Sequence, residues 1–389
     1  MTLPKMFKSI NGLLLFLACY LSVMTSFLVL TRSGYKMGPT LSMASFNLWR
    51  RNYPDRGERL MGNFIDIVTA TDPTHISGVP ALINSILRNT KRPDDVRLHI
   101  VMCGDSAEFM ESYLRCHGFK VDPRKIEIVS FSKYMVDPKT YLLWEKSLAN
   151  ELDKGVCNYA WNYFHRLFPD LKRAFYISVD SIVQAPIEEL WLEASTYPAP
   201  LLAVQDLLNF SSGNFNIKTL SSTFLDRYRR EFSPCTTIFN GGVLVIDLEF
   251  YRKWAFNEEV DFWLQKNTES AEPLWSSGKH SAMQIVYHGL WKVLHPRWNV
   301  RSVGWRKEMR EEDKRIAGIF HWDSPYKPWL ASGANREYWT PYRPEECSGA
   351  GMCMTYSSQV ARMTLWKCVC QTDRAGPHCQ YLVGKKRIS

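Results

Sequence analysis

The sequence predicts an α/β fold in which a mainly parallel sheet is covered by helices on both faces. From Gly62 onward, short apolar runs that suit strands alternate with longer segments whose apolar spacing suits helices. The apolar fraction of 46% and the charged fraction of 22% are ordinary for a globular protein, which excludes a mainly disordered chain. A length of 389 residues fits one large α/β domain with appendages.

The elements follow in a regular order. In chain order, we expect strands at Phe64–Thr71, Val96–Cys103, Lys125–Phe131 and Phe175–Asp180, and helices at Val79–Thr90, Ser106–Phe119 and Asn158–Pro169. β-Branched and aromatic residues favour the strands, and apolar residues three or four positions apart favour the helices. Further along, Thr237–Trp254 predicts a glycine-containing turn, a buried strand and the start of a helix.

A single carboxylate, Asp180, ends the apolar run that begins at Phe175. Residues up to Ile177 suit a strand, and Ser178 to Ser181 suit an exit turn. An acid at the carboxyl end of an interior strand lies where open α/β sheets bind ligands. The alternative is an Asp that only caps the following turn.

An uncharged apolar segment, Leu13–Leu30, is long enough to span a bilayer. It predicts an uncleaved signal anchor with residues 1–12 in the cytosol, a stem at 31–61 and the rest of the chain in the lumen, which is a single-pass type II membrane topology. A cleaved signal peptide and a secreted protein are the alternative. The Asn209 sequon fits a secretory-pathway glycoprotein.

Charge and cysteine content narrow the class of protein. The net charge of +9 is spread along the chain without a nucleic-acid motif, so we expect an anionic small substrate and no nucleic acid. Half of the ten cysteines lie in a short terminal segment, residues 346–381, which we call the tail. They are Cys347, Cys353, Cys368, Cys370 and Cys379. Such a cluster is typical of a disulfide-rich module in an oxidising compartment, and the paired CxxC spacing of a zinc site is lacking.

Several segments in order resemble glycosyltransferase family 8, in the style of animal glycosyltransferase-8-domain-containing proteins and plant galacturonosyltransferases. The segments are "IVTATD", "ALINSILRNTKRP", "FYISVDSIVQ", "FNGGVLVIDL", "HPRWNV" and "HWDSPYKPW". The resemblance implies a GT-A fold, Rossmann-like, over residues 62–345. It also implies a retaining hexosyl- or pentosyltransferase of the Golgi membrane that uses a UDP-sugar and a glycan or glycoprotein acceptor.

The resemblance assigns roles to residues around the strand end. The family places an acid-x-acid motif there, which holds a divalent metal, usually manganese, against the donor diphosphate. Asp180 matches the second acid, and Ser178 stands where the first acid is expected. His321 matches the third metal ligand and Lys327 the contact to the donor phosphate, with Trp329 packing behind them. A lone histidine without this context is more often structural.

Two further segments are assigned in the same way. Thr69, Ala70 and Thr71 follow the first strand, where the family seats the nucleotide base and ribose. The alternative is a turn that only ends the strand. Asn240 and Gly242 match the family's Asn-x-Gly beside the transferred sugar, where glycine either permits a close backbone approach or serves a turn.

Several positions depart from the family pattern. Trp161 stands where relatives carry an Arg that approaches the donor, and Lys279 and His280 stand where many carry an Asp-Gln pair. Ser178 and Ser324 replace an acid and a glycine. These departures leave open a second hypothesis, a catalytically degenerate lumenal protein that binds a nucleotide sugar or a glycan.

The tail resembles the later part of an EGF-like module. That resemblance implies disulfides between Cys347 and Cys368 and between Cys370 and Cys379. Cys353 is then left either free or paired with a cysteine of the main domain.

Overall fold

The structure, a computed structural model, describes residues 64–146, 155–197, 199–276, 280–358, 363–372 and 374–382. The predicted cytoplasmic tail, the anchor Leu13–Leu30 and the predicted stem all lie outside these ranges. None of the helices within these ranges combines the length and the apolar character that a membrane crossing needs.

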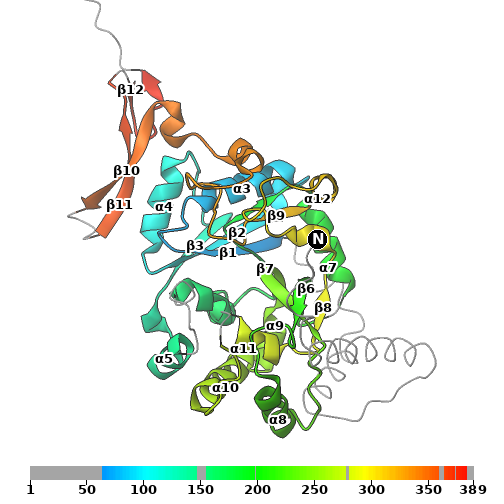
Figure 1. Cartoon of the computed structure of the whole chain (residues 1–389). Coiled ribbons are helices and arrows are strands. Elements are labelled where there is room, and N and C mark those ends of the chain that lie inside the picture. The colour runs from blue at the N-terminus through cyan, green and yellow to red at the C-terminus, as the bar shows by residue number, and fades with distance from the viewer. Residues whose placement is uncertain are drawn as a thin grey trace, which may run out of the picture.

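A seven-stranded sheet forms the centre of the molecule (Figure 1), in the order β3-β2-β1-β4-β7-β6-β8. The strands are β1 Ile65–Thr71, β2 Val96–Cys103, β3 Ile126–Phe131, β4 Arg173–Ile177, β6 Leu201–Asn209, β7 Thr237–Asp247 and β8 Trp291–Val293. The β1–β2, β2–β3, β1–β4 and β6–β8 pairs are parallel, and β7 is antiparallel to both β4 and β6. The predicted mainly parallel sheet is therefore confirmed.

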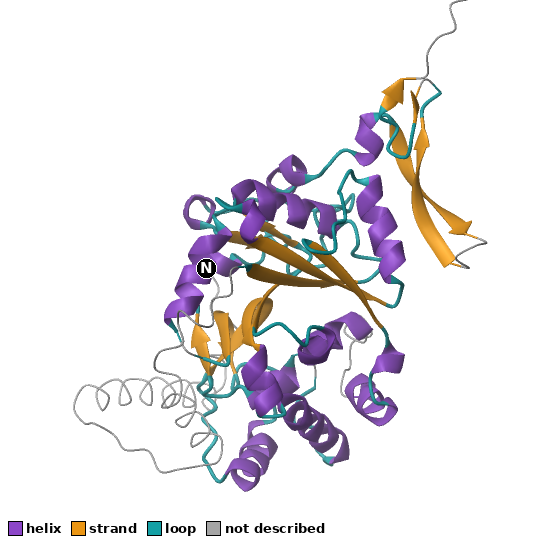
Figure 2. Ribbon diagram, turned by 180° about the vertical axis from the view of Figure 1, so that it is seen from behind, coloured by secondary structure: helices purple, strands orange, loops and turns teal. Residues whose placement is uncertain are grey.

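Helices cover both faces of this sheet, as Figure 2 shows. One face carries α3 Gly78–Asn89, α4 Ala107–Cys116 and α7 Ile187–Thr196. The other carries α6 Phe164–Leu167, α8 Ile217–Tyr228, α9 Leu248–Lys253, α10 Phe256–Glu269 and α11 Ser281–Val286. Alternation along β1 supplies both layers, because Ile65 and Ile67 pack on the α3 side while Val68 and Ala70 pack on the other.

Two predicted elements differ in type, and the strand expected at Phe175–Asp180 is β4 Arg173–Ile177, which ends before Asp180. The helix expected at Asn158–Pro169 is mostly a 3-10 helix, η5 Val156–Tyr163, followed by the short α6. Consecutive residues from Tyr159 to Tyr163 are all buried, so this segment lacks the single exposed face of a surface helix. The turn expected at Gly241-Gly242 is wrong, because β7 runs straight through both glycines.

Smaller elements complete the fold. They are α5 Pro138–Lys146, α12 Glu311–Ile316, β5 Ser181–Val183 and β9 Ile319–His321 in the main domain, with η2 Pro93–Asp95, η3 Lys133–Met135, η6 Pro296–Asn299, η7 Arg336–Tyr338 and η8 Thr340–Tyr342. The tail comprises η9 Glu346–Gly349, β10 Gly351–Ser358, β11 Met363–Cys370, β12 Arg374–Ala375 and β13 Tyr381–Leu382. The β10–β11 hairpin lies against α4 at one side of the main domain (Figure 1).

Candidate active site

The end of β4 and the strand β9 meet at Asp180. β4 ends at Ile177, and the next turn bonds to β7, because the Ser178 backbone N–H donates to the Gly242 carbonyl at 2.8 Å. β5 then pairs with β9 so that Ser181 lies opposite His321. The Trp322 N–H donates to the Asp180 carbonyl at 2.9 Å. This pairing brings two predicted site residues that are far apart in the chain to one place.

The Asp180 carboxylate is buried and contacts three side chains. Its Oδ1 accepts a hydrogen bond from the Ser178 hydroxyl at 2.5 Å and lies 3.2 Å from His321 Nε2. Its Oδ2 pairs with the Lys327 ammonium, which also donates to the Trp322 carbonyl at 2.7 Å. Burial alone would raise the pKa of Asp180, but the charges of Lys327 and His321 hold it well below its usual range. Asp180 is therefore an anion at any physiological pH.

A chain of amides orients the His321 ring. Asn299 donates its side-chain amide to Asn240 Oδ1 at 2.8 Å, so its own oxygen faces His321 Nδ1 at 3.0 Å. Nδ1 then carries a proton, and Nε2 points at Asp180. Asn240 Oδ1 also accepts the Gly242 N–H at 2.9 Å. Asn240 is thus tied to the imidazole through Asn299, a residue that carried no assignment on sequence grounds although it lies inside the quoted segment "HPRWNV".

Two histidine rings, those of His321 and His280, explain why β7 carries glycine at positions 241 and 242. A Cβ on Gly242 would lie 2.1 Å from His321 Cε1, and one on Gly241 would lie 2.3 Å from His280 Cε1. Of the two explanations offered by the sequence, close backbone approach is the correct one. His280 also makes an edge-to-face contact with Trp161 at 4.7 Å between ring centroids. Two of the departing positions therefore meet beside the Asn240 segment, whereas Lys279 lies outside the described residues.

The strand end at Thr69–Thr71 lies at the same sheet edge, because β1 and β4 are parallel neighbours. Thr69 and Thr71 are buried, and Thr69 Oγ1 has no hydrogen-bond partner among the described residues. Asp72 closes the following turn by accepting the backbone N–H groups of Thr74 and His75 at 2.9 and 3.0 Å. No hydrogen bond or ion pair within the described ranges joins Thr69–Thr71 to Asp180. The turn that the sequence offered as an alternative is present, and a nucleotide site there remains a prediction.

Trp329 connects the loop that carries His321 and Lys327 to the start of α3. Its indole contacts His75 edge to face, with ring centroids 6.2 Å apart. A Cβ on Gly78 would lie 2.8 Å from Trp329 Cζ3, so the helix start and the indole are in close contact. The predicted packing role of Trp329 is consistent with this position, which lies between the β1 end and the Lys327 loop.

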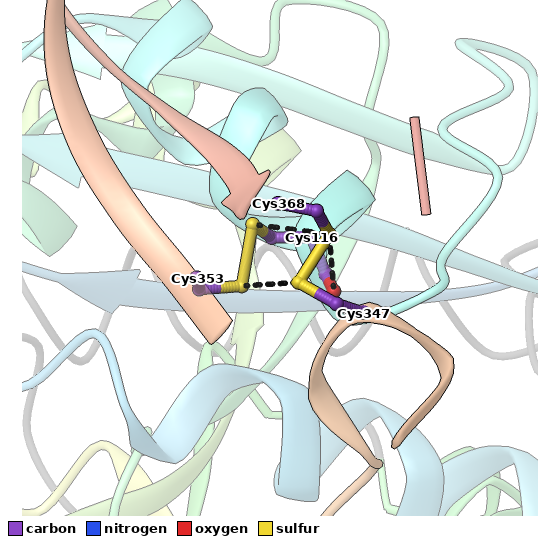
Figure 3. A group of neighbouring side chains, drawn as sticks. All are labelled: Cys116, Cys347, Cys353 and Cys368. Carbon is purple, nitrogen blue, oxygen red and sulfur yellow. Dashed lines mark hydrogen bonds between the residues drawn. A yellow bond between two sulfur atoms is a disulfide. The ribbon is translucent and has the colours of Figure 1, made fainter. Parts of the chain in front are cut away.

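Two pairs of tail cysteines are joined as the resemblance to an EGF-like module implied. Disulfides join Cys347 to Cys368 and Cys370 to Cys379. Cys353, whose partner the sequence left open, is joined to Cys116 at the end of α4 (Figure 3). The Sγ atoms of Cys116, Cys347, Cys353 and Cys368 lie within 4.8 Å of one another. Because these sulfurs are paired, they are not the thiolates that a zinc site requires. A further disulfide joins Cys103 to Cys157.

Comparisons with known proteins find similarity to glycosyltransferases. The family model for glycosyl transferase family 8 matches residues 66–333. Probable galacturonosyltransferase-like 5 of Arabidopsis thaliana is 27% identical over 293 residues, which cover 72% of this chain and 76% of that protein. Glycosyltransferase 8 domain-containing protein 2 of Homo sapiens is 25% identical over 296 residues, which cover 71% of this chain and 80% of that protein.

A solved structure shows the same fold. The galactosyltransferase LgtC in complex with donor and acceptor sugar analogues superimposes with a TM-score of 0.52 and 16% identity, covering 72% of this chain and 95% of that one. At this identity the likeness concerns the fold alone. It agrees with a GT-A-like arrangement of the central sheet.

Proposed function

The chain belongs to glycosyl transferase family 8, and from this premise we propose that it transfers a sugar from a UDP-sugar to a glycan or glycoprotein acceptor with retention of the anomeric configuration. One observation carries the proposal. Asp180, His321 and Lys327, which the family pattern assigns to the donor diphosphate, form one buried cluster at the carboxyl end of β4. Open α/β sheets bind their ligands at such an edge.

The family and its fold imply a divalent metal, and the residues at Asp180 fit one. Asp180 supplies an ionised carboxylate, and His321 Nε2, 3.2 Å from it, would bind a metal once this nitrogen carries no proton. Carboxylate and imidazole together suit manganese, whereas Ser178 adds only a neutral hydroxyl. A bound cation would supply charge neutralisation of the donor diphosphate.

Lys327 is the residue on which we place most of the catalytic contribution of the chain itself. Its ammonium already stands in the cluster, and the side chain is mostly buried, so a charge there acts through a low-dielectric environment. As the bond between sugar and diphosphate breaks, negative charge grows on the leaving phosphate, and Lys327 would offset it. Catalysis then depends on positioning and charge stabilisation.

The remaining assigned residues have positioning roles in this proposal. Asn240 and Gly242 would lie beside the transferred sugar, where the absence of a Cβ at Gly242 lets the backbone approach the His321 ring. Thr69, Ala70 and Thr71 would contact the base and ribose. Their position at the carboxyl end of β1, next to β4, supports a ligand at this strand end.

We further propose that the protein is a type II membrane protein of the Golgi with its transferase domain in the lumen and that the tail is an EGF-like module. The disulfides support an oxidising compartment. In sealed microsomes, the bulk of the chain should resist added protease until detergent is present. Digestion of the carboxyl terminus without detergent would contradict this orientation.

A second candidate function is a lumenal protein that binds a nucleotide sugar or glycan without catalysis. Ser178 in place of an acid, and the Trp161–His280 contact where polar groups are expected, favour it.

Calorimetry of the full chain with UDP, with and without Mn²⁺, tests the shared donor site. Mass-spectrometric screening against a panel of UDP-sugars then separates the two functions, because only a transferase or a donor hydrolase consumes a UDP-sugar. Binding of neither UDP nor any UDP-sugar would exclude the transferase.

A further inference from the structure

An aromatic pair stands exposed on the loops beside the candidate active site. Trp305 is 58% exposed and Tyr326 43% exposed, and their rings meet edge to face with centroids 5.4 Å apart. Among the tryptophans whose exposure the structure describes, Trp305 alone is exposed. A single exposed aromatic residue needs no explanation, but two that contact each other form an apolar surface at a ligand-binding edge.

The pair is held in place by the backbone around it. The Trp305 indole N–H donates to the Asp323 carbonyl at 3.3 Å, and the Tyr326 N–H donates to the Ser324 hydroxyl at 3.1 Å. A Cβ on Gly304 would lie 1.9 Å from Ser324 Oγ, so the two loops are in direct contact. The rings are therefore presented on a fixed support, which lowers the entropy cost of binding a ligand against them.

The position of the pair relates it to the donor site. Tyr326 precedes Lys327, and the Trp305 indole binds the segment that follows His321. Arg301 joins this segment to the sheet, with its guanidinium 3.1 Å from Asp323 Oδ2 and 2.8 Å from Asp206 Oδ2 on β6. β6 runs in the same direction as β4, because both are antiparallel to the β7 strand between them. Asp206 and Asp180 thus approach the same edge of the sheet.

Asp206, which pairs with Arg301, lies on β6, on the side of β4 away from the strand end assigned to the nucleotide. The strand end assigned to the nucleotide belongs to β1, which borders β4 on one side, while β7 and β6 follow on the other. A saccharide that receives the transferred sugar needs a surface next to the donor phosphate but away from the base. Pyranose rings have one face lined by C–H groups, which packs on an indole, and a rim of hydroxyls, which bonds to charged groups.

We propose that Trp305 and Tyr326 form the acceptor subsite and bind the apolar face of a neutral pyranose, with Arg301 and Asp323 beside them to receive its hydroxyls. This inference rests on the proposed transferase function. It names the side of the site, the residues and the chemical class of the acceptor, none of which follows from the assignments around Asp180.

The test uses two matched variants of the full chain, Trp305→Phe and Trp305→Leu. Both lose the indole N–H, and only the first keeps an aromatic face. The chains are immobilised, and retention of methyl β-D-galactopyranoside, methyl β-D-glucopyranoside and methyl β-D-xylopyranoside is measured with and without UDP. Tyr134→Ala, at an 87% exposed tyrosine of η3, which follows the edge strand β3, is the control.

We expect at least one glycoside to be retained by the wild type, by Trp305→Phe and by the control, and about tenfold less by Trp305→Leu. Equal retention by the Phe and Leu variants overturns the proposal. So does a wild-type column that binds UDP and retains none of the probes. Glycoside retention that depends on Trp305, on a column that does not bind UDP, would leave the subsite in place and exclude the transferase function instead. UDP affinity also reports on folding, since a folded variant should bind UDP within about twofold of wild type.

Discussion

At the scale of single residues, the charges around Asp180 decide what the site can do. A buried carboxylate is costly unless it is paired, and Asp180 is paired with Lys327 and His321 and bonded to Ser178. These partners keep Asp180 ionised without a fourth group. A metal or a donor phosphate at this site would have to replace one of these contacts.

Replacing Lys327 by Ala should lower turnover by roughly a hundredfold or more, by analogy with the loss of one stabilising contact to a developing negative charge. Turnover of the UDP-sugar found in the panel screen is the measurement. Lys218→Ala, at an exposed position of α8, is the control. Because the loss of Lys327 also leaves Asp180 with one cation fewer, thermal unfolding is followed in parallel. An undiminished rate in a folded Lys327→Ala protein would contradict the assigned role.

Replacing Ser178 by Asp should tighten Mn²⁺ binding. The Ser178 hydroxyl is 2.5 Å from Asp180 Oδ1, so a carboxylate at this position would place two anions side by side. A bound cation relieves the repulsion between the two carboxylates, so the affinity of the site for Mn²⁺ rises. The free energy of unfolding of the variant then depends more strongly on the Mn²⁺ concentration. Calorimetry with Mn²⁺ and UDP measures the affinity, and Ser178→Ala, which removes the hydroxyl without adding charge, is the control. Equal Mn²⁺ affinities for Ser178→Asp and wild type would show that the cluster does not hold a metal.

Residue-level prediction from the sequence was uneven for a physical reason. Asp180 could be placed at a strand end because the strand pattern is local. Asp180 and Lys327 are 147 residues apart in the sequence, and they meet because β5 pairs with β9. Each of these strands has only three residues, which is too short for a recognisable apolar pattern. Asn299 was missed because nothing in its neighbours marks an amide that orients a distant imidazole.

At the scale of elements, a buried histidine links the first three strands. His99 on β2 lies 2.9 Å from Asp66 on β1 through Nε2 and 2.7 Å from Glu127 on β3 through Nδ1. Burial alone would lower the pKa of His99, but the two carboxylates raise it above its usual value. The protonated imidazole therefore joins all three strands.

This link predicts a pH-dependent stability. A histidine whose pKa is higher in the folded state stabilises the fold fully below its unfolded pKa of about 6.5 and loses that contribution as pH rises through the folded pKa. Replacing His99 by Gln should therefore lower the free energy of unfolding by about 1–3 kcal/mol at pH 6 and by clearly less at pH 9. Urea unfolding at both values measures it. His295→Gln, at an exposed histidine, should show no such difference. A loss that is equal at both pH values would mean that His99 is neutral in the fold.

The strand pattern was the most predictable part of the fold, and the exceptions share a cause. The strands at 64–71, 96–103 and 125–131 agree with β1, β2 and β3 to within one residue at either end. The apolar runs of β1 and β2 are buried on both faces of the parallel part of the sheet, whereas β3, at the sheet edge, is buried at Ile126 and Phe131 and exposed at Glu127 and Ser130. The glycines of β7 and the 3-10 segment η5 were misjudged. In both places tertiary contacts, with His280 and His321 or with the aromatic core, overrode the local preference.

At the scale of the whole molecule, a disulfide and aromatic packing hold the tail against the main domain. The Cys116–Cys353 disulfide joins β10 to the end of α4, with a sequence separation of 237. Trp366 of β11 packs against Phe109 and Tyr113 of the same helix, with ring centroids 5.8 and 4.9 Å apart. The resemblance of the tail to an EGF-like module implied two of its disulfides, but the partner of Cys353 lies in another part of the fold and left no signal beyond an odd cysteine.

Removing the Cys116–Cys353 disulfide should release the tail from α4 without unfolding the main domain. Replacing Cys116 and Cys353 together by Ala leaves no lone thiol, and the loss of one native disulfide typically costs a small module about 2 to 5 kcal/mol. The short segment between η8 and η9 should then become the first site of cleavage in limited proteolysis under non-reducing conditions. The control is the Cys370→Ala/Cys379→Ala double variant, which loses a disulfide of the same tail but keeps the link to α4. If this segment stays resistant to protease in the Cys116/Cys353 variant, the packing of Trp366 on α4 is enough to hold the tail in place. If the same variant binds UDP more weakly, the tail also supports the donor site.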